Sequence, residues 1–224
     1  MSPRPLSRTS RSDLRERIID AAWQQIALEG APALSLRAIA RALKIAAPSI
    51  YNYFPNRDAL VTALVVEAYT LFGDAQHNAQ QAAPTEDLPG QLRAIGNAYR
   101  DWANKYPERY QLIFGTPIPG YVAPREQTLP AAECAISPLV SVIAALHQNG
   151  RLKSYPPVQD EEMNCLAIAV LIWSRVHGFV SLEIAGSLPP FGMDPAQLYQ
   201  YELDAILTQF PSSNETVSRK VSGE

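Results

Sequence analysis

A pair of short helical patterns near the N-terminus constrains the fold more than any other feature of the sequence. Ser35 suits the N-cap position and precedes a run over residues 36–43 whose apolar residues have helical spacing. After a break of three or four residues, a second short pattern begins at Pro48, which suits the first turn of a helix. A longer amphipathic pattern, which Gly30 ends, precedes the pair. This order of three helices predicts a helix-turn-helix unit at about residues 35–54.

Helical periodicity continues along the rest of the chain, without a convincing strand pattern. Segments rich in Pro and Gly separate further predicted helices at about residues 57–81, 91–105, 107–114, 126–148, 158–185 and 195–210. Pro130 and Pro138 lie inside the predicted helix 126–148, so we expect this helix to be kinked or split. The sequence therefore predicts an all-α protein with a three-helix DNA-binding domain followed by a larger helical domain. The expected boundaries are a flexible basic arm at 1–11, a helix-turn-helix domain at 12–72, an effector-binding and dimerisation domain at 73–210, and a flexible tail at 211–224.

The sequence carries no pattern typical of export or of membrane insertion. Residues 1–17 lack the apolar stretch of a secretion signal, and the longest unbroken apolar run, residues 166–173, is far shorter than the roughly 20 residues that cross a bilayer. Cys134 and Cys165 lie far apart and outside any metal-ligand spacing, as expected of buried thiols in a reducing compartment. We expect a cytoplasmic protein with no membrane partner.

Charge is distributed unevenly along the chain. The whole chain has a net charge of −3, but its first 60 residues hold nine basic and five acidic side chains, which gives this part +4 and leaves −7 for the remainder. A basic end on an acidic chain indicates that the N-terminal part contacts a polyanion. Charge blocks are also common on ordinary solvated surfaces, so this feature has weight only together with the helix pair.

Residues 35–60, SLRAIARALKIAAPSIYNYFPNRDAL, resemble the DNA-binding region of the TetR family of transcriptional regulators. The matching places are held by Ile39-Ala40, Ile45, Ile50, Tyr51, Phe54 and Leu60. The resemblance extends over about residues 12–60 and implies a regulator that binds double-stranded DNA. The alternative is a plain helical bundle that contains a short helix pair.

The sequence departs from the TetR pattern at four positions. Lys44 stands where the family usually has a turn glycine, and a side chain held in the left-handed region costs about 1 kcal/mol. Ala46 replaces a serine, so the second short helix lacks that N-cap and depends on Pro48 to begin. Tyr53 replaces a histidine and Arg57 a lysine, and both retain a donor for a phosphate oxygen.

The geometry of a helix-turn-helix unit gives the candidate DNA contacts. Side chains at the edges of the unit are candidates for phosphate contacts, which fix register without reading sequence. They are Ser35, Arg37, Tyr51, Tyr53 and Arg57. Side chains on the exposed side of the second helix could reach base edges, with asparagine suited to adenine and alanine or proline to a thymine methyl. They are Ala47, Pro48, Ser49 and Asn52. Arg4, Arg8 and Arg11 could contact the DNA backbone or could belong to an unengaged arm.

A second resemblance lies in the C-terminal part. Residues 106–114, YPERYQLIF, and 173–178, WSRVHG, look like the TetR-type C-terminal domains named for a Trp-His-Gly signature. This resemblance implies a helical effector domain and a homodimer formed by the helices at about 158–185 and 195–210. Both are apolar over much of their surface, which also fits a self-complementary four-helix interface. In the alternative, they are core helices of a monomer.

Aromatic residues cluster in the same part of the sequence. An apolar cavity with a few polar groups is the usual form of a small-molecule site, so these residues are candidates for binding a small, largely apolar effector. The candidates are Trp102, Tyr106, Tyr110, Phe114, Trp173 and His177. Aromatic residues at helical spacing are also frequent core residues, and His177 could be a hydrogen-bonded core histidine.

These patterns together predict a ligand-responsive transcriptional regulator of palindromic operator DNA. The resemblance to the TetR family implies that the protein is a repressor, which a small molecule releases from its operator. The alternative is a DNA-binding regulator that has no small-molecule ligand and is controlled by a partner protein. We do not expect an enzyme, because the three histidines lie outside catalytic or metal-ligand spacing and no phosphate-binding loop occurs. No cofactor or metal is expected.

Overall fold

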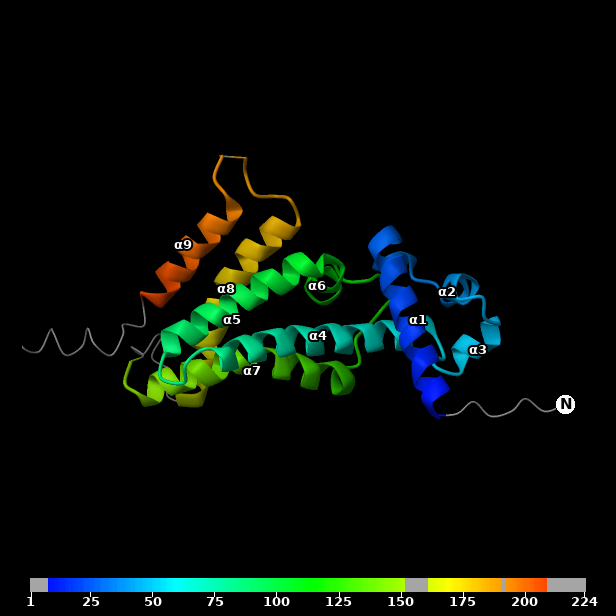
Figure 1. The fold of residues 1–224 in the computed structure, drawn as a ribbon, viewed down its shortest axis with the longest axis horizontal. Helices are drawn as coiled ribbons and strands as arrows, with labels where there is room; N and C mark the ends of the chain where they lie inside the picture. The colour runs from blue at the N-terminus through cyan, green and yellow to red at the C-terminus, as the bar shows by residue number, and fades with distance from the viewer. Residues whose placement is uncertain (1–7, 152–160, 191, 209–224) are drawn as a thin grey trace, which may run out of the picture. The chain divides into compact units, whose positions relative to one another are not determined.

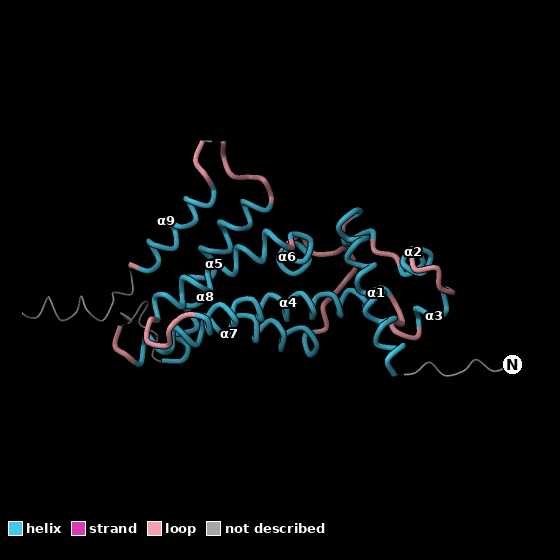
Figure 2. Tube along the Cα trace, in the orientation of Figure 1, coloured by secondary structure: helices cyan, strands magenta, loops and turns pink. Residues whose placement is uncertain are grey.

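The structure is a computed structural model that describes residues 8–151, 161–190 and 192–208 (Figure 1). Over these residues every regular element is helical, with loops between the helices and no strand (Figure 2). The elements are α1 Arg8–Glu29, η1 Ala31–Ala33, α2 Leu36–Ala42, α3 Ala47–Tyr51, α4 Arg57–Ala82, α5 Leu88–Lys105, α6 Pro107–Phe114, α7 Arg125–Gln148, α8 Glu161–Ile184 and α9 Pro195–Leu207. The all-α class is confirmed.

The helices group into two compact units. The first unit comprises Met1–Tyr69 and Tyr106–Ala131, and therefore contains α1, α2, α3, α6 and the beginnings of α4 and α7. The second unit comprises Thr70–Lys105 and Ala132–Glu224, with α5, α8, α9 and the rest of α4 and α7. The segment Tyr106–Ala131 thus groups with the first unit, whereas the sequence analysis assigns it to the second domain.

The core of the first unit is formed where the two short helices pack against α1 and the beginning of α4. On α1, Ile18 and Ala22 are fully buried and Ile26 is nearly so, as the four-residue spacing predicts. Ile39 from α2 and Ile50 from α3 complete this cluster, and Figure 1 shows α1, α2 and α3 gathered together. Because Ile50 is buried, the opposite side of α3 is exposed to solvent.

Asn56 caps α4, because its Oδ1 accepts a hydrogen bond of 2.8 Å from the Ala59 N–H. Helix α1 begins at Arg8, within the segment 1–11 that the sequence predicts to be a flexible arm. Arg4 and the tail at 211–224 lie outside the described residues, as do the side chains of Arg8 and Arg11.

Helix α7 is continuous from Arg125 to Gln148, so it is not split at its prolines, and the kink stays a prediction. Pro138 has no N–H to donate to the carbonyl of Cys134, four residues earlier. The hydroxyl of Ser137 donates to that carbonyl at 2.8 Å and replaces the missing bond. Pro130 lies in the second turn of α7. Just before it, the carbonyl of Pro124 accepts hydrogen bonds from both the N–H and the hydroxyl of Thr128.

In the second unit, α5 packs against both α8 and α9. Gly96 permits a close approach between α5 and α9, because a Cβ atom there would lie 2.7 Å from Leu203 Cδ2. The buried Tyr199 hydroxyl donates to the carbonyl of Gly96. An ion pair joins α5 to α8, with Arg100 Nε 2.8 Å from Glu183 Oε2. These contacts fix three of the five helices that line the cavity described below.

Two helical segments are long and apolar enough to cross a membrane by length and composition, namely α7 and residues 164–184 of α8. This is weak evidence for a membrane protein, because core helices of soluble proteins pass the same test. The exposed large apolar residues of α8 form one stripe, which is described with the candidate sites.

Candidate functional site

Two side chains, those of Ser35 and of Gln25 from α1, form hydrogen bonds at the start of α2. Ser35 is the N-cap, and its Oγ accepts a hydrogen bond of 3.4 Å from the Ala38 N–H. The Ser35 N–H donates to Gln25 Oε1 of α1 at 3.1 Å, while the Gln25 amide donates to the carbonyl of Ala33. The segment before α2 is thereby fixed to α1. The contact of Ser35 with phosphate remains a prediction.

The turn between α2 and α3 has the geometry that the sequence predicts. Lys44 has a φ of 55°, the one positive φ among the described non-glycine residues. The Ile45 N–H donates to the carbonyl of Ala40, and the Lys44 N–H donates to that of Arg41. This pair of bonds is a Schellman motif, whose left-handed position usually holds glycine. Lys44 therefore keeps the turn geometry at a cost in stability.

Replacing Lys44 by Gly is expected to stabilise the first unit by about 1 kcal/mol, because glycine adopts the left-handed region without the Cβ clash. The melting temperature should rise by about 2–4 °C, measured by scanning calorimetry. Lys44→Ala keeps the clash and serves as the control, with a melting temperature near that of the wild type. Equal stability of the glycine and alanine variants would contradict strain at this position.

The outer side of α3 carries the predicted base-reading residues. Ala47, Pro48 and Asn52 are exposed, and Ser49 is half-buried. The N-cap residue Ala46 makes no side-chain bond, as the sequence analysis expects, and its carbonyl accepts the first helical bond, from the Ser49 N–H. The helix is only five residues long, so burial of its inner side rather than its own hydrogen bonds must hold it in place.

The predicted phosphate-binding side chains differ in their exposure to solvent. Arg37 and Tyr51 are exposed, with 41% of Tyr51 accessible, and Tyr53 is half-buried against the core. Arg41 and Lys44 add two further cations on α2 and the turn. The outer side of the helix pair is therefore basic, as a surface that approaches DNA phosphates requires.

Arg57 has a different environment from the one that the sequence suggests. Its Nε donates to the carbonyl of Leu34 at 3.2 Å, and its Nη2 lies 3.1 Å from the carbonyls of both Ala31 and Pro32. The guanidinium thus binds the backbone of the segment between α1 and α2. Its contact with DNA phosphate stays a prediction, and the structure gives it a positioning role that spacing alone could not indicate.

A second cluster in the first unit joins α1, α4 and α6. The Trp23 indole N–H donates to Glu67 Oε1 at 3.1 Å, and the guanidinium carbon of Arg109 lies 4.8 Å from the centroid of the Trp23 ring. The same guanidinium lies 4.7 Å from the centroid of the Tyr106 ring. We call these four residues the tryptophan cluster. Arg109 is thus held between two aromatic rings by cation–π interactions.

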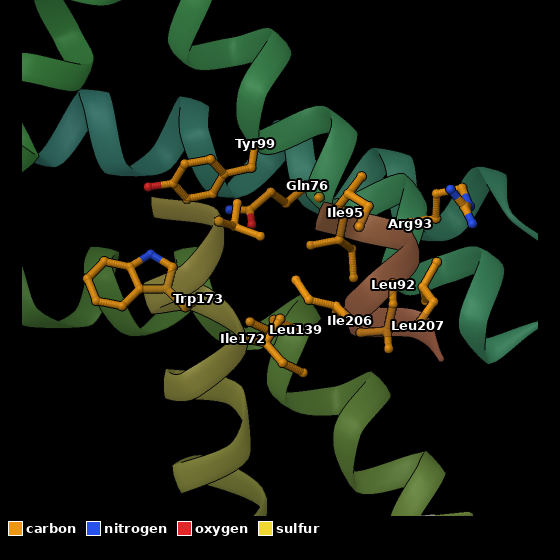
Figure 3. A pocket seen from close by; sticks show the side chains of 13 residues that line it. Gln76, Leu92, Arg93, Ile95, Tyr99, Leu139, Ile172, Trp173, Ile206 and Leu207 are labelled. Carbon is orange, nitrogen blue, oxygen red and sulfur yellow. The ribbon is translucent and has the colours of Figure 1, made fainter. Parts of the chain in front are cut away.

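The second unit contains an apolar cavity (Figure 3). Its volume is about 430 Å³, a value that includes space open to solvent. The lining comes from α4, α5, α7, α8 and α9, and consists of Gln76, Leu92, Arg93, Ile95, Gly96, Tyr99, Leu139, Ile172, Trp173, Val176, Leu203, Ile206 and Leu207.

The predicted ligand-binding residues are divided between the two units. Trp173 lines the cavity, whereas Trp102 is buried beside Phe72, with ring centroids 5.0 Å apart. Tyr106, Tyr110 and Phe114 belong to the first unit, where Tyr106 lies in the tryptophan cluster and the rings of Tyr110 and Phe114 are 5.2 Å apart. Most of the actual lining consists of leucine, isoleucine and valine, which the search for aromatic residues missed. Helical periodicity alone cannot distinguish such residues from the core.

His177 lies one turn beyond Trp173 and stacks on its ring, with centroids 4.8 Å apart. Its Nδ1 is 2.9 Å from the hydroxyl of Tyr99, which lines the cavity, and its Nε2 is 3.3 Å from the hydroxyl of Ser181. Burial lowers the pKa of His177 below its ordinary value of 6.5. This environment matches the hydrogen-bonded core histidine that the sequence analysis keeps as an alternative.

The lowered pKa of His177 predicts a pH dependence of stability. The unfolded chain binds this proton more readily than the folded chain, so the free energy of unfolding should fall as the pH decreases below 6.5. Chemical unfolding at a series of pH values should show a weaker decrease for His177→Gln. The matched control is His77→Gln, which removes a histidine exposed on α4. An unchanged pH profile in His177→Gln would show that this group does not cause the decrease.

The remaining side of α8 is an exposed apolar stripe. Leu166, Val170, Leu171 and Leu182 are each between 41% and 47% accessible. Gly178 lies in the same stripe, and a Cβ atom there would meet nothing within 4 Å. We call these five residues the α8 stripe. Large apolar side chains that recur on one helix face without cover are typical of an interface.

The comparisons with known proteins agree with this arrangement. The family model described as "Bacterial regulatory proteins, tetR family" matches residues 18–64, and the one described as "Tetracyclin repressor-like, C-terminal domain" matches residues 92–206. The HTH-type transcriptional regulator Rv1816 of Mycobacterium tuberculosis is 30% identical over 196 residues, which cover 80% of this chain and 84% of that protein.

Solved structures support the same assignment. The regulatory protein SCO4313, whose crystal structure is known, is 36% identical in sequence to this chain. The two structures superpose with a TM-score of 0.75 over 92% of this chain and 100% of that chain. The TetR family transcriptional regulator PfmR from Thermus thermophilus shares the fold, with a TM-score of 0.61 at 17% identity and coverage of 86% and 97%. Matches to both parts of the chain lead to one conclusion. The chain belongs to the TetR family and is a DNA-binding transcriptional regulator.

Proposed function

We propose that the chain is a ligand-responsive repressor, which binds a palindromic operator as a homodimer and leaves it when a small, largely apolar effector binds. The observation that carries this proposal is the course of α4. Gln76 of α4 lines the cavity of the second unit, and the same helix continues without a break into the first unit, where it bears Glu67 of the tryptophan cluster. A ligand in the cavity contacts a helix that also belongs to the helix-turn-helix unit.

In this proposal α3 enters the major groove with its outer side. Asn52 suits adenine, and Ala47 or Pro48 suits a thymine methyl. Arg37 and Tyr51, which flank this side and are exposed, contact phosphates and fix the register. Two copies of α3 read two half-sites, which must be separated by about one helical repeat of 34 Å or a multiple of it.

The proposed dimer forms through α8 and α9. The α8 stripe offers a self-complementary apolar surface, and Gly178 allows close approach of a second helix. Tyr201 on α9 is 65% accessible and adds an aromatic side chain to the same pair of helices. Arg175 Nε lies 2.6 Å from Glu202 Oε1, so α8 and α9 are joined within one protomer and can act as one surface.

Ligand binding can weaken DNA binding only if the two conformations of the dimer differ in ligand affinity. In the proposal a bound ligand shifts α4 and α5, which both line the cavity. Helix α5 is followed after one residue by α6, whose Arg109 packs on Trp23 of α1. Both α4 and α6 therefore lead to the tryptophan cluster, and a shift of either changes the position of α1.

The proposal is tested by a thermal-shift screen of small apolar compounds, followed by titration of the protein–operator complex with each compound that raises the melting temperature. Release of operator DNA by a stabilising compound supports the proposal. Stabilising compounds that leave the complex intact would contradict it. Control by a partner protein is the second candidate, and it is favoured if no compound stabilises the protein.

The tryptophan cluster gives a test of the coupling itself. Arg109→Met keeps an unbranched apolar side chain but removes the charge that lies between the Trp23 and Tyr106 rings. We expect the variant to bind the stabilising compound as the wild type does and to require a higher compound concentration for operator release. Arg125→Met, which changes an exposed arginine at the start of α7, should behave as the wild type. Equal release by all three proteins would exclude the cluster from the coupling.

A further inference from the structure

The amide of Gln76 is a polar group inside an otherwise apolar part of the cavity wall. The residue is 4% accessible and lies beside Tyr99 and Ile95 in Figure 3. Its Nε2 donates to two main-chain carbonyls, that of Ala135 at 3.0 Å and that of Phe72 at 3.4 Å. Both N–H groups of the amide are therefore used within the protein.

These two bonds also fix the orientation of the amide. Rotating the group by half a turn would direct Oε1 at two carbonyl oxygens, which repel it. In the observed orientation Oε1 accepts no hydrogen bond from the described residues. This oxygen keeps some accessible surface. A ligand that covers it without supplying a donor leaves the acceptor unsatisfied, which is costly, whereas a ligand with a donor avoids this cost.

Two other polar groups of the lining, the Tyr99 hydroxyl and the Arg93 guanidinium, already have partners. The Tyr99 hydroxyl is 2.9 Å from His177 Nδ1. Arg93 Nη2 is 2.7 Å from Asp204 Oδ1, and the two side chains remain 42% and 55% accessible. Figure 3 shows the Arg93 guanidinium on the opposite side of the cavity from Tyr99. An anionic ligand would have to displace Asp204 from Arg93, so the wall favours a neutral molecule.

We propose that the effector is a neutral apolar molecule with one hydrogen-bond donor, such as an alcohol or a phenol, whose hydroxyl donates to Gln76 Oε1. This inference rests on the proposed ligand-sensing function and adds the chemical class of the ligand. The apolar part of the molecule lies against Ile95, Leu139 and Ile172, which line the cavity. A methyl ether of the same skeleton cannot donate, and a carboxylate brings a charge into apolar surroundings without a partner.

Isothermal titration calorimetry with octanol, decanol and dodecanol, their methyl ethers and the corresponding carboxylates tests this class. We expect at least one alcohol to bind roughly tenfold more tightly than its methyl ether, a preference that one well-placed hydrogen bond accounts for. The carboxylates should bind more weakly than the alcohols. In Gln76→Met, which keeps the length of the side chain and removes the acceptor, alcohol and ether should bind equally.

Gln80→Met is the matched control, because Gln80 lies one turn later on α4 and bonds to Gln91 and Ser141 instead of lining the cavity. This variant should keep the preference for alcohol. Equal binding of alcohol and ether by the wild type, or a preference that persists in Gln76→Met, would overturn the proposed class and leave ligand sensing intact. Binding of none of the compounds would count against the proposed class and against the cavity as a sensor together.

Discussion

Replacing Leu171 by Glu is expected to convert the dimer into monomers and to weaken operator binding by more than about a hundredfold. Leu171 is 46% accessible in the single chain and lies in the α8 stripe, which the proposed interface covers. A carboxylate buried there without a partner disfavours association. Each monomer then holds one half-site, and the gain from binding two linked half-sites disappears. Analytical ultracentrifugation gives the mass, and fluorescence anisotropy with operator DNA gives the affinity.

The matched control is Leu71→Glu, which places the same charge at another partly exposed leucine, on α4 of the second unit. This variant should remain dimeric and bind DNA as the wild type does. A dimeric Leu171→Glu variant with full operator affinity would move the interface away from the α8 stripe. The exposure of the apolar side chains of α8 would then not be explained by a dimer interface.

Replacing Arg57 by Ala is expected to lower the free energy of unfolding of the first unit by about 2 kcal/mol, because three backbone carbonyls lose their charged donor. Arg57→Lys should be almost as unstable, since a single ammonium group cannot reproduce the fork that reaches Leu34 and Ala31 together. Chemical unfolding gives these values. DNA affinity should fall in both variants, because the carbonyls that Arg57 binds belong to the segment before α2.

The dependence of DNA affinity on salt separates this positioning role from a phosphate contact. Arg37 is exposed, and Arg37→Ala should reduce the magnitude of the salt slope by about one, because one cation no longer neutralises a phosphate. Arg57→Ala should leave the slope unchanged while it lowers stability. A reduced slope and unchanged stability in Arg57→Ala would show that the side chain binds phosphate, as the sequence pattern suggests.

Local features of the first unit could be predicted from the sequence because local chemistry determines them. Ser35 and Asn56 cap helices through bonds to residues three positions later, and Lys44 has the left-handed geometry that its place in the turn requires. The same local reasoning does not decide between a kink and a split for α7, which is continuous. The proline rule is correct about Pro138, but the rule does not include the hydroxyl of Ser137 beside it.

Features that depend on distant residues could not be predicted. Arg57 reaches carbonyls 23 to 26 residues earlier in the chain, a contact that no spacing pattern reveals. Gln76 has the sequence context of a solvent-exposed glutamine and becomes a cavity residue only because α7 packs against it. The aromatic residues between 99 and 114 look like one cluster in the sequence, but Tyr99 and Trp102 belong to the second unit and Tyr110 and Phe114 to the first.

Selection of bound sequences from a random duplex library by the full-length protein tests the central claim most directly. A dimeric TetR regulator with α3 in the major groove should enrich a palindrome whose half-sites are about one helical repeat apart, or a multiple of it. Replacing Asn52 by Ala should weaken binding to the selected site. The same replacement should have the smallest effect on sites that are altered at the base pair that Asn52 reads, because the contact is already lost there. Enrichment of a single unpaired half-site, or no enrichment at modest salt, would contradict an operator-binding dimer.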